Sequence, residues 1–564
     1  MAPNVAIGIQ DFSTIIENNY FYIDKTAFLK EWWDSGDSVT LITRPRRFGK
    51  TLTMSMTEQF FSLEYARRSD LFESFEIWKN KEYRKLQGTY PVISLSFARI
   101  KERDYEKTKQ KMCEILRNIY IKFSYIKESA RLTDADRAYY DRMLAEDIRE
   151  TDATSSLYQL SDFLYRYYGK KVIILLDEYD TPMQEAFVDG YWEELVAFTR
   201  SLFNSTFKTN PALERGIMTG ITRASKESIF SDLNNLNVIT STSLEYETSF
   251  GFTEEEVFTA LDNMGMSEQK EIVKSWYDGF VFGTEKDIYN PWSITNYLDK
   301  KQVRAYWADT SSNSLISRLI RKASAGIKEQ MEELLQGKEI IVNFDEQIVF
   351  EQLDQDENAI WSLMLASGYL KAEQVEYRGL LREPWYHLKI TNLETTAMFT
   401  NLFKSWFNQS RTNYNQFIKA LLQNDIDAMN YYMNQISMAT FSYFDVDGVE
   451  GGKSEPERFY HGFVLGLIAE QTDIYEIRSN RESGFGRYDV MMIPKKRDNC
   501  YPAVIIEFKV HNAIKEANLE ASVKAAKKQI EEKNYDAELF ARGFCKEEIL
   551  HYGFAFEGKK VLIG

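Results

Sequence analysis

The chain has 564 residues, of which 44% are hydrophobic and 14% aromatic, and its formal net charge is −16 at pH 7. A chain of this length is too long to fold around a single hydrophobic core and favours about three or four domains. The apolar content excludes general disorder. The acidic balance excludes a surface that coats nucleic acid broadly with basic charge, although it allows a local basic groove.

The apolar and cysteine patterns bear on location and on metal chemistry. The longest apolar runs, such as Val172–Leu176, are far shorter than the roughly 20 residues of a membrane-spanning helix, and no charged, apolar and small-residue leader opens the sequence. The 3 cysteines and 4 histidines are scattered, which disfavours a disulfide framework or a cysteine–histidine metal site. These features predict a cytoplasmic protein without membrane contact, in which carboxylates hold any metal.

Short β-branched runs alternate with helical patterns in the first part of the chain. Val39–Thr43 is typical of a buried strand, and a Gly-Lys-Thr turn and a segment with helical spacing of apolar residues follow it. Further strands are predicted at Tyr90–Phe97, Lys170–Asp180 and Arg215–Arg223. The alternation predicts an α/β fold with a doubly wound parallel sheet over residues 1–300.

The rest of the chain divides into a helical and a strand-containing part. Residues 301–440 are mostly helical in pattern, with a winged helix as one option for part of this middle region. The Gly- and Asp-rich run Asp445–Gly452 is typical of a linker. Strand patterns return at Gly486–Pro494, Tyr501–Val510 and Tyr552–Ile563. We therefore predict a third domain over residues 441–564.

The turn after the first strand, RPRRFGKT, matches the second half of a phosphate-binding loop. In such a loop, backbone amides and a helix N-terminus face phosphate oxygens, the lysine adds charge near the β and γ phosphates, and the hydroxyl holds Mg²⁺. Gly49, Lys50 and Thr51 supply these groups. The standard pattern has glycine where this chain has Arg44, which leaves an ordinary helix start as the alternative.

A carboxylate pair, Asp177 and Glu178, ends the third predicted strand. In a nucleotide site the aspartate holds Mg²⁺ through water, and the next carboxylate orients or deprotonates the attacking water. Two strand-end signals in the correct order favour a nucleotide site over two unrelated turns.

A second carboxylate set lies near the C-terminus. Alternation along a strand places Glu507 and Lys509 on one face and Phe508 on the other, and a hairpin would bring Asp489 beside them. Two carboxylates bind Mg²⁺ or Mn²⁺, which polarises a phosphodiester and activates water, while Lys509 orients that water or neutralises charge on phosphorus. Taken alone, a Glu-x-Lys pair is equally typical of a solvated strand face.

Several segments together resemble the bacterial AAA-ATPase-like family, whose members usually carry a C-terminal PD-(D/E)XK nuclease domain. They are IGIQDFSTIIENNYFYIDKTAFLKEW, LITRPRRFGKTL, LLDEYDTPM, GITRASKESIFSDLNNL, and WYDGFVFG with YNPWSITNYL. The resemblance runs from about Ile7 to Leu298 and resumes near the C-terminus. It implies a P-loop NTPase fold that binds ATP with Mg²⁺, in which RPRRFGKT is the family's usual loop, and a C-terminal α/β restriction-endonuclease-like domain.

The resemblance also implies roles for residues that the motifs alone do not identify. Asp24 and Lys25, in YIDKT, would lie beside the base or sugar, and Arg223, in TGITR, would contact the γ-phosphate. A structural ion pair is the alternative for Arg223. Glu457 and Gln529 would complete the nuclease-type site.

The candidate residues fall into three groups. The predicted catalytic residues are Lys50, Asp177, Glu178, Arg223, Glu457, Asp489, Glu507, Lys509 and Gln529. The predicted nucleotide-binding residues are Asp24, Lys25, Arg44, Pro45, Arg46, Arg47, Phe48, Gly49, Lys50, Thr51 and Leu52. The predicted metal ligands are Thr51, Asp177, Asp489 and Glu507.

The sequence therefore predicts an ATP-binding and ATP-hydrolysing module joined to a metal-dependent nuclease that acts on DNA or RNA. The alternative is a nucleotide-dependent sensor or scaffold whose nuclease-like domain binds without cutting. The predicted partners are a nucleotide, DNA or RNA and, as an option, further copies of the chain in a homo-oligomer.

Overall fold

The computed structural model describes residues 3–222, 229–230, 233–308, 314–346, 353, 356–406, 411–444, 454–483, 486–496, 501–511, 516–557 and 560–564. The chain forms two compact units, each made of two separate segments of the sequence. The first unit comprises Met1–Ser311 and Ile341–Glu394, and the second comprises Ser312–Ile340 and Thr395–Gly564. Among the described residues, no helix combines the length and apolar character needed to cross a bilayer.

A five-stranded parallel sheet is the centre of the first unit, with strand order β2-β3-β4-β1-β5. The strands are β1 (Val39–Thr43), β2 (Val92–Ser96), β3 (Val172–Asp177), β4 (Leu213–Gly220) and β5 (Leu236–Ile239). Every residue of β1 and β3 is buried, as expected for parallel strands covered on both faces. This sheet confirms the doubly wound α/β fold and aligns the carboxyl ends of β1, β3 and β4 at one edge.

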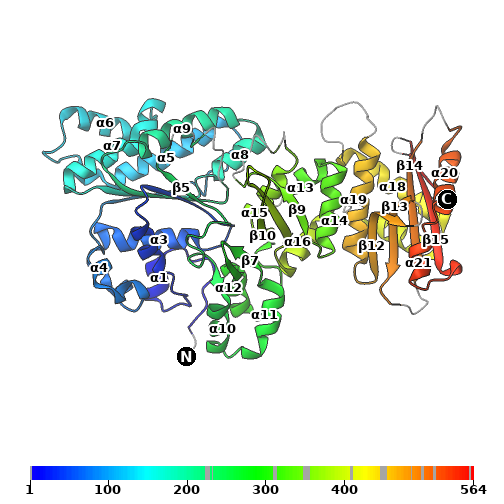
Figure 1. Cartoon of the computed structure of the whole chain (residues 1–564). Coiled ribbons are helices and arrows are strands. Elements are labelled where there is room, and N and C mark those ends of the chain that lie inside the picture. The colour runs from blue at the N-terminus through cyan, green and yellow to red at the C-terminus, as the bar shows by residue number, and fades with distance from the viewer. Residues whose placement is uncertain are drawn as a thin grey trace. The chain divides into compact units, whose positions relative to one another are not determined.

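Helices cover both faces of this sheet: Figure 1 shows α3 on one side and α5, α7 and α9 on the other. The helices of this part are α1 (Phe12–Glu17), α2 (Ala27–Ser35), α3 (Lys50–Phe61), α4 (Lys81–Arg84), α5 (Tyr105–Lys122), α6 (Asp134–Leu144), α7 (Glu150–Tyr168), α8 (Thr181–Asp189) and α9 (Trp192–Phe207). Buried aromatic side chains such as Phe28, Trp32 and Phe60 fill the core around α2 and α3. Burial of these large rings stabilises α3, which begins at Lys50 within the Gly-Lys-Thr motif.

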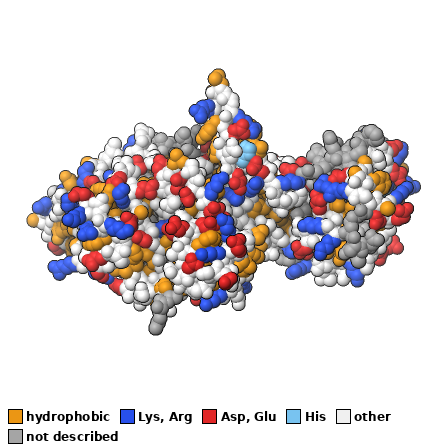
Figure 2. Space-filling view, turned by 60° about the horizontal axis from the view of Figure 1, so that its bottom comes forward, with side chains coloured by type: hydrophobic (Ala, Val, Ile, Leu, Met, Phe, Trp, Pro, Cys, Tyr) orange, Lys and Arg blue, Asp and Glu red, His pale blue; other side chains and the backbone are white. Residues whose placement is uncertain are grey.

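Two smaller three-stranded sheets complete the first unit, and their β6–β8, β7–β8 and β10–β11 pairs are antiparallel. One has the order β6-β8-β7 and the other β10-β11-β9. The elements are β6 (Phe252–Thr253), α10 (Glu254–Asn263), α11 (Lys270–Tyr277), β7 (Phe280–Phe282), β8 (Glu285–Tyr289), α12 (Pro291–Lys300), β9 (Ile340–Asn343), α15 (Ala359–Ala366), β10 (Leu370–Arg378) and β11 (Glu383–Ile390). The tip of the β10–β11 hairpin exposes Leu380 and Leu381 almost completely. Figure 2 shows acidic and basic side chains interspersed over the face in view.

The second unit contains a mixed five-stranded sheet of order β12-β13-β14-β15-β16. Only the β14–β15 pair is parallel among its described pairings. The strands are β12 (Tyr475–Ser483), β13 (Gly486–Pro494), β14 (Ala503–Val510), β15 (Ile549–Glu557) and β16 (Lys560–Ile563). The helices are α13 (Ser314–Lys322), α14 (Ala325–Leu335), α16 (Leu393–Trp406, which starts at the unit boundary), α17 (Arg411–Gln423), α18 (Ile426–Phe444), α19 (Ser454–Gln471), α20 (Leu519–Glu532) and α21 (Ala537–Ala541). The helical middle region and the α/β C-terminal region match the predicted fold class.

Side chains of α18 pair with the edge strand β16 of this sheet. The amide of Asn430 exchanges two hydrogen bonds of 2.8 Å with the backbone of Ile563. Asn434 does the same with Val561, at 2.7 and 3.0 Å. These asparagines satisfy edge groups that would otherwise be open to another strand. Helices before residue 440 thus pack within the same unit as the C-terminal sheet, while the division at residues 300 and 440 stays a prediction.

Candidate nucleotide and metal sites

The loop between β1 and α3 has the backbone of a tight turn that opens onto a helix. Gly49 has a φ of +83°, and Lys50 directly after it is the first residue of α3. Arg47 also has a positive φ, of +67°, which is uncommon for a residue with a side chain. Because the first amides of a helix have no partner within the helix, the start of α3 offers donors and positive partial charge to an anion.

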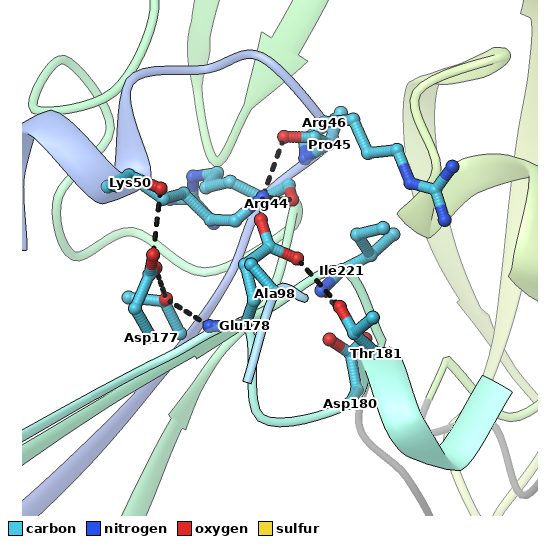
Figure 3. Close-up of polar contacts among 12 residues, drawn as sticks. Arg44, Pro45, Arg46, Lys50, Ala98, Asp177, Glu178, Asp180, Thr181 and Ile221 are labelled. Atoms are coloured by element: carbon cyan, nitrogen blue, oxygen red, sulfur yellow. Dashed lines mark hydrogen bonds and ion pairs between the residues drawn. The ribbon is translucent and has the colours of Figure 1, made fainter. Parts of the chain in front are cut away.

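Lys50 points back into this loop and is only 2% exposed. Its Nζ donates hydrogen bonds of 3.0 Å to the carbonyl oxygens of Arg44 and Pro45, and it lies 3.5 Å from Oε1 of Glu178 (Figure 3). The two carbonyl partners are neutral, and Glu178 is the carboxylate nearest to the ammonium group among these three partners. A phosphate group entering the loop offers it a stronger, charge-assisted partner.

Thr51 and Asp177 meet at the carboxyl end of β3. Oγ1 of Thr51 donates to Oδ2 of Asp177 at 2.8 Å, and Oγ1 of Thr219, in β4, donates to Oδ1 at 2.5 Å. Burial raises the pKa of the Asp177 carboxyl above its ordinary value, although both hydroxyl hydrogen bonds oppose the rise. A hydroxyl and a carboxylate at this separation fit Mg²⁺, which prefers oxygen ligands.

Glu178 occupies a left-handed backbone conformation, with φ +52°. Its backbone amide donates to Oγ1 of Thr219 at 3.2 Å, and its Oε2 accepts from Oγ1 of Thr181 at 3.4 Å. A non-glycine residue in this conformation is strained and persists only where its surroundings hold it. The result is a carboxylate that faces Lys50 and lines the cavity described next.

A cavity of about 410 Å³ joins the loop to more distant parts of the first unit. The residues from Arg46 to Thr53 form its polar end together with Glu178. Apolar and aromatic side chains form other walls, and they include Ile7, Ile9, Phe21, Tyr22, Phe252 and Trp292. A cavity with a cationic loop at one end and flat apolar walls elsewhere suits a ligand that carries both phosphates and an aromatic base.

Arg44 turns away from this cavity. Its side chain is completely buried, and Nη1 donates to the carbonyl oxygens of Thr240 at 2.6 Å and Thr43 at 3.1 Å, with Nη2 3.5 Å from that of Tyr246. The guanidinium also lies 4.5 Å from the ring centre of Phe282. Burial lowers its pKa to about 10, which still leaves it protonated at neutral pH. Neither Arg44 nor Pro45 lines the cavity, so their part in the site is to offer carbonyls to Lys50.

The other predicted nucleotide-binding residues of the loop line the cavity in different ways. Arg46 donates to Oε1 of Gln184 at 3.0 Å, and Arg47 lies 4.3 Å from the ring centre of Trp292. Phe48 packs edge-to-face on Phe280, with 4.8 Å between ring centres. Leu52 is a further wall residue.

The YIDKT segment divides between the cavity and the fold. Lys25 lines the cavity, where its Nζ bonds the carboxylate of Glu256 at 2.7 Å. Asp24 instead accepts from the backbone amides of Thr26 and Glu76, both at 2.8 Å, and does not line the cavity. Arg223 lies outside the described residues.

The second unit brings together Asp489, Glu507, Lys509 and Gln529. Gln529, in α20, donates through Nε2 to Oε1 of Glu507 and accepts at Oε1 from Nζ of Lys509, the latter at 2.8 Å. Oδ2 of Asp489, in β13, accepts from the amide of Phe508 at 2.6 Å, which fixes it against β14. Glu457 lies in α19, but its side chain is outside the described part of the structure.

The carboxylate of Glu507 is the most perturbed group in this cluster. It is 3% exposed, and burial together with the charge of Asp489 raises its pKa to about 8. Its buried Oε2 has no hydrogen-bond partner among the described residues. Because an unpaired buried carboxylate oxygen is costly, this atom fits a divalent cation shared with Asp489.

Three residues near the sites were not among the predictions. Thr219 holds Asp177, and Asp180 accepts from the amides of Ile221 and Thr222, each at 2.9 Å. Tyr535 accepts from Nε2 of Gln529 at 3.2 Å. Thr219 could have been predicted, because it is a hydroxyl residue at the end of the strand beside β3. The contacts of Asp180 and Tyr535 depend on tertiary packing.

Two family models match the chain. Residues 6–230 match the AAA-ATPase-like family described as "Predicted AAA-ATPase", and residues 455–564 match the PD-(D/E)XK nuclease superfamily. A protein of Azotobacter chroococcum mcd 1, described as an uncharacterized protein in the vnfD 5' region, is 26% identical over 393 residues. That match covers 69% of this chain and 68% of the relative.

Proposed function

Because the chain carries an AAA-ATPase-like domain and a C-terminal PD-(D/E)XK nuclease superfamily domain, we propose that it is an ATP-hydrolysing protein with a metal-dependent nuclease activity on DNA or RNA. The observation that carries the proposal is the convergence of Lys50, Thr51, Asp177 and Glu178 on one phosphate-type loop. The cluster around Glu507 supports the second activity in the same way.

At the first site, each side chain has a role that follows from its present contacts. Lys50 exchanges the carbonyls of its own loop for the β and γ oxygens of ATP. Thr51 and Asp177 would hold Mg²⁺, which supplies charge neutralisation at the phosphates when bound. Glu178 orients the attacking water and accepts its proton. Arg223 is proposed as the γ-phosphate contact of the loop after β4.

At the second site, Asp489 and Glu507 would hold Mg²⁺ or Mn²⁺, which polarises the scissile phosphodiester when bound. Lys509 orients the attacking water or neutralises charge on the phosphate. Gln529 contacts both Glu507 and Lys509 and thereby fixes their separation. Glu457 is proposed to contribute a further carboxylate from α19.

We further propose that nucleotide occupancy controls access to the nuclease site. The idea is motivated by the presence of both candidate sites on one chain. The test measures nucleic-acid cleavage with and without ATP, in the wild type and in Lys50→Ala. If nucleotide controls access, ATP should change the cleavage rate of the wild type but not that of Lys50→Ala. Equal cleavage rates in all four conditions would reject the coupling.

The alternative function is a nucleotide-dependent sensor or scaffold that binds nucleic acid without cutting it. One observation favours it: burial and the charge of Asp489 raise the pKa of Glu507 to about 8, so this carboxyl keeps its proton at neutral pH unless a cation displaces it. Cleavage of DNA or RNA by the wild type, lost in Glu507→Ala and in Lys509→Ala, supports the enzyme. Absence of cleavage by the wild type with Mg²⁺ and with Mn²⁺ supports the scaffold.

A further inference from the structure

The phosphate-type loop contains an arginine whose charged end is directed away from the loop's own lysine. Arg46 lines the cavity, but Figure 3 shows its guanidinium extended away from Lys50. Nη2 of Arg46 donates instead to Oε1 of Gln184, in α8, at 3.0 Å. A guanidinium is a planar fork of donors that suits phosphate oxygens, and a neutral amide is a weaker partner for it. Gln184 therefore holds the Arg46 guanidinium through a hydrogen bond that a phosphate group could replace.

The orientation of the Gln184 amide is fixed from its other end. Nε2 of Gln184 donates to Oδ2 of Asp180 at 3.1 Å. A carboxylate accepts only and a guanidinium donates only, so a glutamine between them must turn its NH₂ to Asp180 and its carbonyl to Arg46. In this chain of hydrogen bonds, Arg46 therefore donates to Gln184, and Gln184 donates to Asp180. The bond to Asp180 keeps Oε1 of Gln184 facing Arg46 in the loop.

Asp180 is a rigid anchor for this arrangement. Its side chain is 0% exposed, and Oδ2 also accepts from the amides of Ile221 and Thr222 at 2.9 Å and from Oγ1 of Thr222 at 3.1 Å. Four donors thus converge on Oδ2, while burial and the charge of Glu178 raise the pKa of Asp180. The same residue therefore ties Gln184 to the end of β4.

We propose that Arg46 distinguishes a nucleoside triphosphate from the diphosphate, and that Gln184 is a positioning residue that holds Arg46 back until a γ-phosphate competes for it. The inference rests on the proposed ATP site. The γ-phosphate supplies the differential affinity, because it adds anionic oxygens that pair with a guanidinium more strongly than an amide carbonyl does. When Arg46 leaves, the carbonyl of Gln184 loses this donor, while its NH₂ stays on Asp180 at the start of α8.

The test is a calorimetric titration of the full chain with Mg·ATP and Mg·ADP. The variants are Gln184→Met, which keeps the length of the side chain but removes both amide ends, Arg46→Ala, and the two combined. We expect Gln184→Met to bind ATP about three- to tenfold more tightly, the effect of removing one competing hydrogen bond, and to leave the affinity for ADP unchanged. Arg46→Ala should lower the preference for ATP over ADP, and Gln184→Met should then have no effect on ATP binding.

Glu185→Ala, one residue further along α8, is the matched control and should leave both affinities unchanged. Gln184→Ala is a second variant in case the methionine packs badly, and it should tighten ATP binding in the same direction. Equal tightening of ATP and ADP, or a gain from Gln184→Met that persists without Arg46, would overturn the inference. Failure of the wild type to bind either nucleotide refutes the ATP site itself, which is a distinguishable result.

Discussion

Replacing Arg44 by glycine restores the standard form of the phosphate loop, and yet we expect it to damage the protein. The Arg44 guanidinium is completely buried and is shared among the carbonyl oxygens of Thr43, Thr240 and Tyr246, with Phe282 beneath it. Arg44→Gly removes the guanidinium donor from these carbonyls, of which those of Thr240 and Tyr246 keep a backbone donor at 3.3 Å, and it leaves a cavity of side-chain size.

The magnitude follows from these contacts. Losing a hydrogen bond to a charged group costs about 1.5–3 kcal/mol, and deleting a large buried side chain costs about 2–5 kcal/mol. Removing a buried charge recovers part of this loss, because the guanidinium no longer has to be desolvated. We therefore expect a net destabilisation of about 3–5 kcal/mol, which corresponds to a drop in Tm of roughly 5 °C for a unit of this size.

The assay is thermal unfolding by circular dichroism of the wild type, Arg44→Gly and Arg44→Lys, each followed by ATP titration. Arg44→Lys keeps the charge but cannot reach all three carbonyls, so its Tm should fall between the other two. An Arg44→Gly protein as stable as the wild type, with equal or tighter ATP binding, would refute the structural role given to Arg44.

Three further predictions concern the two sites and the core. Lys50→Ala should weaken ATP binding at least about tenfold, whereas Glu178→Gln should keep binding and slow hydrolysis about 100-fold or more, as single-turnover assays would reveal. Glu507→Ala and Lys509→Ala should each abolish cleavage without lowering Tm; full activity in either would remove that residue from the mechanism. Burial raises the pKa of the Glu394 carboxyl to about 7 from its ordinary 4.5, so the native state keeps a proton that the unfolded chain releases between these values. Stability should therefore fall by up to about 3 kcal/mol as the pH rises from 4.5 to 7, and Glu394→Gln should remove that fall. The measurement is urea unfolding of the wild type and of Glu394→Gln at about pH 4.5 and about pH 8. A difference in midpoint between the two proteins that is the same at both pH values would contradict the assignment.

The parts of the fold that were predictable have a local cause. The β1 strand was predicted at its observed bounds, Val39–Thr43, because β-branched residues next to a glycine turn specify a strand without help from distant contacts. Alternation along β14 likewise put Glu507 and Lys509 on one face, and Gln529 in the structure contacts both. In each case a period of two residues or a fixed motif carries the information.

The placement of Arg44 could not be read from the sequence. Its strongest contact, with the carbonyl of Thr240, joins residues separated by 196 positions, and nothing in the loop itself shows which way the side chain turns. The same holds for α14, which shares a unit with the C-terminal sheet because Gln336 beside it donates to the carbonyl of Ile477 at 2.7 Å. Such contacts form only once the whole unit is assembled.

Binding of ATP to the full-length wild-type protein tests the central claim most directly. Calorimetry with Mg·ATP should give a saturable isotherm, and Lys50→Ala should weaken the affinity at least about tenfold. An absence of saturable heat at millimolar ATP, in protein whose melting curve shows that it is folded, would contradict the account.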